Sequence, residues 1–222
     1  MCVLHLLAHL STSFSASASC PPSSFHTLGS LDLDEFTRAT WYIQQQQITG
    51  YQPADSLYCV TATYNLQGAK VPFFSGTVAS VYNYANEGEV NGKDQNAKNT
   101  TLCARAVDKT DSSRLAVAPC FLPNSLAGPY WVLDVGKAEG SSEMTWAVII
   151  GGEPKESFPD GCTTTEKGVN GAGLWLFSRT PVAPANELNA MYAVLADRGV
   201  ASSQLHNVTQ VGCKYAGAFI KH

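Results

Sequence analysis

The chain has 222 residues, a formal net charge of −4 and only 14% charged residues against 45% hydrophobic ones. This mild acidity argues against a nucleic-acid partner, and no apolar run reaches the ~18 residues that a transmembrane helix needs. Gly, Ser, Thr, Asn and Gln take the place of the missing charged residues, and this composition favours strands and turns over long salt-bridged helices.

The first predicted element is a signal or targeting segment at residues 1–18. It contains the apolar run VLHLLAHL, and Ala16-Ser17-Ala18 places small residues where signal peptidase accepts them. Residues 19–222 are then a single mature domain. Because the segment has no Lys or Arg before its apolar run, a buried amphipathic start or a truncated gene model is the alternative. Cleavage would remove Cys2 and leave six cysteines, an even number, in an oxidising compartment.

A short helical turn is expected at residues 31–36, and strands follow it. Runs of β-branched and aromatic residues are separated by Gly, Pro and Asn, which is typical of strands joined by turns. An antiparallel sheet of eight strands can close into a barrel with room for one small ligand. The strands are expected at residues 41–49, 57–66, 71–84, 101–107, 114–121, 130–135, 145–150 and 173–178.

One helix is predicted after the strands. Pro184 suits the first helical position, where its missing N–H is not needed, and Gly199 suits a left-handed C-cap. A stripe with i, i+3, i+4, i+7 spacing is formed by Leu188, Met191, Tyr192 and Leu195. The order of eight strands, one helix and a tail predicts an all-β fold rather than an alternating α/β fold.

Three short segments match signature positions of one family of barrels. Ala39-Thr40-Trp41 stands where that family has Gly-x-Trp before its first strand, residues 128–133 (GPYWVL) match its sixth strand, and residues 175–181 (WLFSRTP) match its last strand. Over about residues 20–213 the chain resembles the lipocalins (calycin superfamily), and the apolipoprotein D type most of all. The resemblance implies an eight-stranded antiparallel up-and-down barrel with one C-terminal α-helix packed outside.

The resemblance also implies a role for two marked residues. Trp41 and Arg179 would meet at the closed end of the barrel, where a guanidinium over an indole contributes ~1–2 kcal/mol when it is desolvated. The alternative is that Arg179 is an ordinary charge at a strand end.

The cysteines can be paired in the same way. The resemblance implies two disulfide bonds, Cys59 with Cys213 and Cys20 with Cys162. The remaining Cys103 and Cys120 are equidistant from the centre of the turn DKTDSS, so they would face each other across a hairpin. Each closure contributes ~2–4 kcal/mol by restricting the unfolded chain. Six cysteines allow fifteen connectivities, so this pattern is a hypothesis.

Alternation along the strands indicates which side chains face the cavity. If Cys59 points out toward the tail, Leu57, Thr61 and Thr63 share its face. On the last strand, Trp175, Phe177 and Arg179 share one face, and Leu174 and Leu176 the other, which fits a strand lined by ligand or core inside and covered by the helix outside. Plain core packing is the alternative for any single aromatic residue. The predicted ligand-binding residues are Tyr58, Val60, Ala62, Tyr64, Phe73, Tyr82, Trp131 and Trp146.

A second resemblance is to the lipocalin domain of violaxanthin de-epoxidase. It rests on Trp41-Tyr42-Ile43, on residues 170–173 and on Asp55 placed four residues before Cys59. It implies a xanthophyll-converting oxidoreductase in a thylakoid lumen, with Asp55 as a proton donor whose pKa is raised in an apolar barrel. A turn aspartate before a strand is the alternative. The cysteine-rich and acidic extensions of that enzyme do not occur in this sequence, which favours a binding protein over an enzyme.

The sequence therefore predicts a lipocalin that binds or transports one small hydrophobic ligand. Carotenoid, retinoid, sterol, fatty acid and tetrapyrrole all remain open. No metal site is predicted, because the five histidines lie near the two ends, and no cofactor is required beyond a bound pigment or lipid. The alternatives are the de-epoxidase-like enzyme and a structural subunit associated peripherally with a membrane or pigment–protein complex. The expected location is outside the cell or in an organelle lumen, the thylakoid lumen included.

Overall fold

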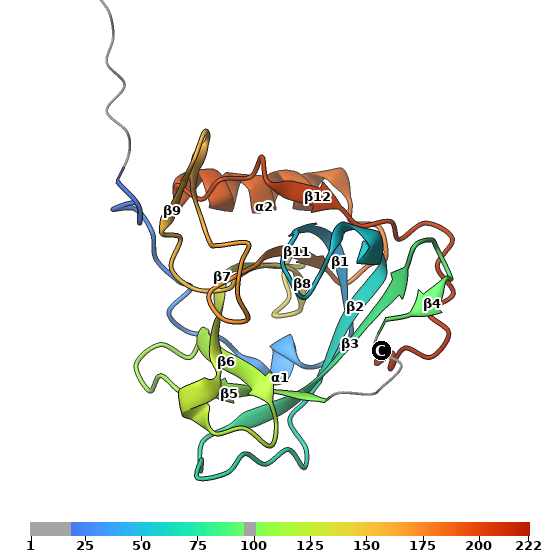
Figure 1. The fold of residues 1–222 in the computed structure, drawn as a ribbon, viewed down its shortest axis with the longest axis horizontal. Coiled ribbons are helices and arrows are strands. Elements are labelled where there is room, and N and C mark those ends of the chain that lie inside the picture. The colour runs from blue at the N-terminus through green and yellow to red at the C-terminus, as the bar shows by residue number, and fades with distance from the viewer. Residues whose placement is uncertain (1–18, 96–100) are drawn as a thin grey trace, which may run out of the picture.

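The computed structural model describes residues 19–95 and 101–222, and its main feature is one closed antiparallel sheet (Figure 1). Each strand pairs with the next along the chain, and the last pairs back with the first, which closes the barrel. The barrel strands are β1 (Trp41–Gln47), β2 (Tyr58–Asn65), β3 (Val78–Glu87), β5 (Leu102–Ala106), β6 (Arg114–Pro119), β7 (Gly128–Lys137), β8 (Met144–Ile150) and β11 (Leu174–Ser178).

Shorter helices and strands lie around this barrel. The helical turn α1 (Leu33–Phe36) lies at one end, and the 3₁₀ turns η1 (Ala54–Ser56) and η2 (Asn124–Leu126) precede β2 and β7. The additional short strands are β4 (Lys93–Asp94), which pairs with β3, β9 (Glu156–Phe158) and β10 (Gly161–Thr163), which pair together, and β12 (Leu205–Asn207), which pairs with β1. In the described ranges, no helix is long and apolar enough to cross a membrane. The targeting segment predicted at residues 1–18, with Cys2, lies outside the described residues.

The 13-residue helix α2 (Ala185–Asp197) packs on the outer face of β7, β8 and β11 (Figure 1). Met191 and Leu195 are fully buried in the layer between helix and sheet, because their helical spacing brings both onto one face. Gly199 follows the C-cap with a φ of 64°, a backbone conformation that glycine adopts without strain. These features confirm the predicted all-β barrel with one C-terminal helix packed outside.

The three predicted disulfide bonds are confirmed. They join the N-terminal segment to the long loop between β8 and β11, the C-terminal tail to β2, and β5 to the end of β6. The pairs are Cys20–Cys162, Cys59–Cys213 and Cys103–Cys120.

The strand predicted at residues 71–84 begins only at Val78. Residues 71–74 form a tight turn in which the N–H of Phe74 donates to the carbonyl oxygen of Val71 over 3.3 Å. Pro72 has no N–H to donate to a sheet ladder, and Phe73 adopts a φ of 59°, so this segment cannot continue a strand.

A bulge in β2 changes which residues face inward. The register of β2 against β3 shifts between Tyr58 and Thr61, and Cys59 in the bulge has a φ of 55°. One extra residue reverses the alternation on one side of the bulge. Leu57, which was expected to face outward, therefore joins the interior cluster, whereas Tyr58 is only partly buried and pairs with Thr209 of the tail.

The C-terminal tail fills a gap in the barrel wall. β1 and β2 are paired only through Trp41–Ala62 and Tyr42–Thr61, and beyond these pairs the two strands separate. β12 pairs with β1 in the gap, and the N–H of Val208 then donates to the carbonyl oxygen of Gln44 over 2.9 Å. Val208 is buried in the interior cluster, so the tail supplies part of the barrel lining.

Gln210 and Thr209 complete this join. The side-chain amide of Gln210 donates to the carbonyl oxygens of Ile43 on β1 and Val60 on β2, each over 2.8 Å. Thr209 exchanges backbone hydrogen bonds with Leu57 and Cys59. The tail therefore forms hydrogen bonds with backbone groups of β1 and β2 that the two strands do not pair with each other. Buried backbone N–H and C=O groups need such partners.

Candidate functional site

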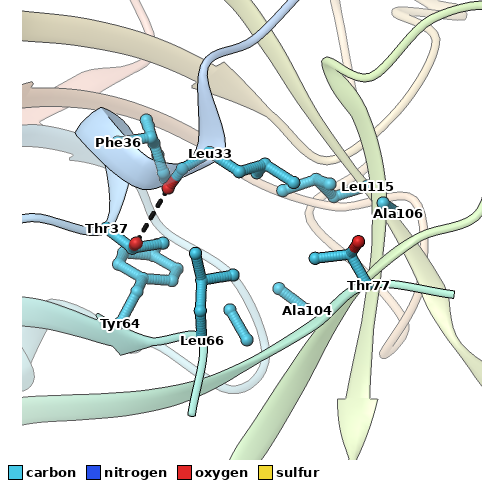
Figure 2. A pocket seen from close by; sticks show the side chains of 10 residues that line it. Leu33, Phe36, Thr37, Tyr64, Leu66, Thr77, Ala104, Ala106 and Leu115 are labelled. Atoms are coloured by element: carbon cyan, nitrogen blue, oxygen red, sulfur yellow. Dashed lines mark hydrogen bonds between the residues drawn. The ribbon is translucent and has the colours of Figure 1, made fainter.

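The interior of the barrel is filled by side chains that alternate inward from all eight strands. The largest of them are aromatic. The ring centroid of Phe36 lies 5.3 Å from that of Trp41 and 5.3 Å from that of Tyr64. A cavity of about 10 Å³ remains between α1 and the sheet, enough for one water molecule (Figure 2). Figure 2 shows Leu33 and Phe36 of α1 on one side of it, with Leu115 beside Leu33, and Tyr64, Leu66 and Ala104 on the other side.

The other half of the interior, toward the loops that follow β1 and β8, carries polar aromatic groups. The hydroxyl groups of Tyr64 and Tyr130 are hydrogen-bonded at 2.5 Å. The ring of Tyr130 lies 5.8 Å from the ring of Trp175, whose indole N–H donates to Oε1 of Gln52 over 2.8 Å. Burial raises the pKa of Tyr64 and of Tyr130 well above the usual value for tyrosine, so both phenols are neutral at physiological pH. We call Tyr64, Tyr130, Trp175 and Gln52 the upper lumen cluster.

Residues 164–173, at the end of the long loop between β8 and β11, cover the barrel mouth above this cluster. On one side, the N–H of Gly50 donates to the carbonyl oxygen of Glu166 over 3.2 Å, and the hydroxyl of Tyr51 donates to that of Ala172 over 2.8 Å. On the other side, Asn170 packs closely on Gly128, where a Cβ would lie 2.4 Å from its Oδ1. The segment therefore connects opposite walls of the mouth.

A second depression lies on the outer surface. It is open, has a volume of about 450 Å³ and is formed by β6, β7 and η2. Its lining is mostly apolar and includes Val107, Ala116, Ala127, Pro129 and Trp131. Arg114 lies beside it, with its guanidinium carbon 4.8 Å from the centroid of the Trp131 ring.

The structure places three of the eight predicted ligand-binding residues inside the barrel. Val60, Ala62 and Tyr64 belong to the interior cluster, because their alternation on β2 is intact after the bulge. Tyr64 also reaches the upper lumen cluster through its hydroxyl.

The other five lie elsewhere, which corrects the expectation that they face the cavity. Tyr58 is turned away by the bulge, and Phe73 is fully exposed at the tip of its turn. Tyr82 points outward because its neighbour Val81 points inward, and its ring packs 5.1 Å from that of Phe219. Trp131 and Trp146 pack with the outer cluster beneath α2, since the adjacent Val132 and Ala147 face the interior.

Several residues of the upper lumen were not singled out from the sequence as ligand-binding. Tyr130 was passed over in favour of Trp131, its neighbour on β7, although alternation permits only one of the two to face inward. Trp175 was predicted to share a face with Phe177, opposite Leu174 and Leu176, without a prediction of which face is inside. The structure confirms the grouping and places Trp175 in the interior cluster. Gln52 gave no signal, because it lies in a loop with no periodicity.

Asp55 lies outside the barrel interior. It is exposed in η1, and its backbone carbonyl oxygen accepts a hydrogen bond from the N–H of Gly88 over 2.7 Å. This placement corresponds to the turn aspartate rather than to a carboxyl group enclosed by apolar side chains. Within residues 19–95 and 101–222, no three His, Cys, Asp or Glu side chains are grouped to hold a metal ion.

Solved structures include barrels of the same architecture at low sequence identity. Apocrustacyanin C2 and lobster apocrustacyanin A1 each have a TM-score of 0.55 at 14% identity, over 84% of this chain and 84% of theirs. The cockroach allergen Per a 4 has a TM-score of 0.51 at 14% identity, over 90% of this chain and 98% of its own. No protein-family model and no curated protein sequence matches the chain. At this level of identity the likeness shows the fold alone.

Proposed function

We propose that this chain, which has the lipocalin fold, binds one small hydrophobic ligand inside its barrel. The observation that supports this most directly is the upper lumen cluster, which places neutral phenol, indole and amide groups beneath a covered mouth. A cavity with mostly apolar walls and a few placed polar groups is typical of sites for small ligands.

Binding requires the interior to open. A ligand site usually has ~300–1,000 Å³, and the cavity in this closed form has about 10 Å³. Residues 164–173 and the rings of Tyr130 and Trp175 are the groups that must move, because they lie between the solvent at the mouth and the deeper core. The hydrogen bonds from Gly50 and Tyr51 to that segment are the contacts that opening would break.

Extraction of the purified native protein with organic solvent, followed by mass spectrometry, tests this proposal. One hydrophobic compound is expected in the extract at a ratio near one per chain. A matched extract of the protein unfolded and refolded without lipid should lack it. An extract without any stoichiometric compound, from protein purified under native conditions, would contradict ligand binding.

We also propose that the protein matures in an oxidising compartment, either outside the cell or in an organelle lumen. Three disulfide bonds within one domain are typical of such compartments. Removal of residues 1–18 is part of this proposal, and N-terminal sequencing of the native protein is expected to begin at Ser19. A mature chain that still carries Cys2 would contradict the cleavage.

A second candidate function is a structural subunit of a larger pigment or membrane assembly. The filled interior and the apolar depression between β6, β7 and η2 favour it, because a docking body needs a surface site and no lumen. Native mass spectrometry of gently solubilised extracts distinguishes the ligand carrier from the structural subunit. A stable complex that survives after all lipid is extracted supports the subunit, and a free monomer that carries a ligand supports the carrier.

A further inference from the structure

Gln46 on β1 is a fully buried amide without a hydrogen-bond partner. Its exposed fraction is 0%, and neither its Nε2 donor nor its Oε1 acceptor contacts a polar group in the described part of the chain. Leaving a buried donor or acceptor unpaired is unfavourable, because the group gives up its hydrogen bond to water and gains none in the protein. A sequence that only had to fill a core would place a Leu or Val at this position, so the amide needs a separate explanation.

The side chain of Gln46 is directed into the barrel. Its antiparallel partner on β11 is Trp175, which lies in the interior cluster, and directly paired residues share one face of a sheet. Gln45 faces outward. Its side-chain Nε2 donates to Oδ1 of Asn207, and its side-chain Oε1 accepts a hydrogen bond from the hydroxyl of Tyr192 on α2. Gln46 is thereby placed beside the upper lumen cluster.

Among the described residues, no charged side chain is hydrogen-bonded to Gln46, and its cross-strand neighbour on β12, the titratable His206, is exposed to solvent. The charged side chains with less than a tenth of their surface exposed are Arg105 and Arg198, and both donate to backbone carbonyl oxygens on the outer side of the barrel. Arg179 lies at the closed end, four residues beyond Trp175 and so about 13 Å further along the strand. An ionised group brought to Gln46 would therefore lose its water without gaining a buried opposite charge, which is unfavourable.

We propose that Gln46 is the hydrogen-bonding anchor for the polar end of the ligand, and that this end is uncharged and both donates and accepts, as a hydroxyl group does. This inference rests on the proposed function. Nε2 would donate a hydrogen bond to the hydroxyl oxygen, and Oε1 would accept one from the hydroxyl O–H. Both unpaired groups of the amide would then have a partner. Among hydrophobic ligands, the anchor selects those ending in an alcohol over those ending in a carboxylate.

Retinol and retinoic acid form a matched pair of probes for this selectivity. They share one apolar skeleton and differ in the polar end, which is a hydroxyl in the first and an ionised carboxylate at pH 7.4 in the second. Binding is measured by energy transfer from the tryptophans to the polyene. The native protein, stripped of lipid, is expected to bind retinol at least tenfold more tightly than retinoic acid.

The variant Gln46→Leu removes both hydrogen-bonding groups at similar volume. Its affinity for retinol should fall by about 5- to 30-fold, the worth of two modest hydrogen bonds, while its affinity for retinoic acid changes less than twofold. Gln45→Leu is the matched control, because it lies on the same strand and faces outward, and it should leave the preference intact. Gln46→Leu should unfold at the same temperature as the native protein or a higher one, since it removes an unpaired buried amide.

Two results would overturn the anchor and leave the proposed function standing: equal affinity of the native protein for both probes, or unchanged retinol affinity in Gln46→Leu. Failure of both probes to bind, together with an extract that contains no stoichiometric compound, would instead overturn ligand binding itself.

Discussion

The guanidinium carbon of Arg179 lies 3.4 Å from the centroid of the Trp41 ring, at the closed end of the barrel. Both side chains also bond the carbonyl oxygen of Phe36 at the end of α1, Arg179 from Nη2 over 3.0 Å and Trp41 from its indole N–H over 2.9 Å. Burial lowers the pKa of Arg179 to about 9, and Arg38 nearby acts in the same direction, so the group is still a cation at neutral pH. The predicted pair therefore closes the base and also fixes α1.

Arg179→Ala is expected to lower the free energy of unfolding by about 2–4 kcal/mol, because a desolvated cation–π contact and several hydrogen bonds to carbonyl oxygens are lost together. Urea denaturation followed by tryptophan fluorescence measures this. Arg114→Ala is the control, since Arg114 also lies over a tryptophan ring but is 41% exposed, and it should cost less than 1 kcal/mol. Equal losses in the two variants would contradict a special role for the closed-end pair.

Removing the Cys59–Cys213 bond should cost more stability than removing the Cys103–Cys120 bond. The two bonds close loops of 154 and 17 residues, and chain entropy gives about 5 and about 3 kcal/mol for loops of these sizes. Double Cys→Ser variants of each pair, compared in urea denaturation, test the order. The reverse order would show that the tail remains in the wall without its covalent link.

Gly173→Ala should be markedly more destabilising than Gly171→Ala. Both glycines have a positive φ that costs about 1 kcal/mol in alanine. A Cβ on Gly173 would also lie 2.0 Å from the ring of Trp175, whereas nothing lies within 4 Å of one on Gly171. We therefore expect about 2–4 kcal/mol for Gly173→Ala, with a shifted tryptophan emission, and about 1 kcal/mol for Gly171→Ala. Similar emission spectra in both variants would place Trp175 elsewhere.

Asp111 should make the stability depend on pH in the acid range. Burial alone would raise its pKa, but hydrogen bonds from Ser113 and Thr27 outweigh burial and hold the pKa below the usual value. Because the folded-state pKa is the lower one, the stabilisation is complete above about pH 4 and is lost as the pH falls through the folded-state pKa.

Asp111→Asn is therefore expected to flatten the loss of thermal stability below pH 4. Glu139→Gln, at an exposed site, should leave the slope of melting temperature against pH unchanged. An unaltered slope in Asp111→Asn would assign the acid sensitivity to other groups.

Sequence patterns predicted the packing of a residue correctly where a single physical constraint determined it. The apolar stripe of α2 could only bury Met191 and Leu195 against the sheet. Cys103 and Cys120 flank one hairpin and form the predicted bond, although the residue directly opposite Cys103 is Ala118. The first-strand Trp41 and last-strand Arg179 were paired by resemblance, and their contact confirms it.

Strand faces could not be predicted where both faces are apolar or where the register is irregular. On β7 and β8 both faces carry apolar residues, because α2 packs on the outside, so Trp131 and Trp146 gave no indication of their side. In the run of four glutamines at residues 44–47, the register shift between Ile43 and Gln45 decides that Gln46 turns inward. A shift of one residue reverses every side chain beyond it, and no composition signal marks it.

The insertion of Val208 between β1 and β2 has a consequence for biosynthesis. During translation, β1 and β2 are both complete about 140 residues before the segment that fills the gap between them, so the growing chain carries an open seam along its wall. Because this contact is late and distant in sequence, we expect the filling of the gap between β1 and β2 to be a slow final event of folding. We therefore expect the nascent protein to pass through a stage in which its lumen is accessible from the side, before residues 205–210 fill the gap.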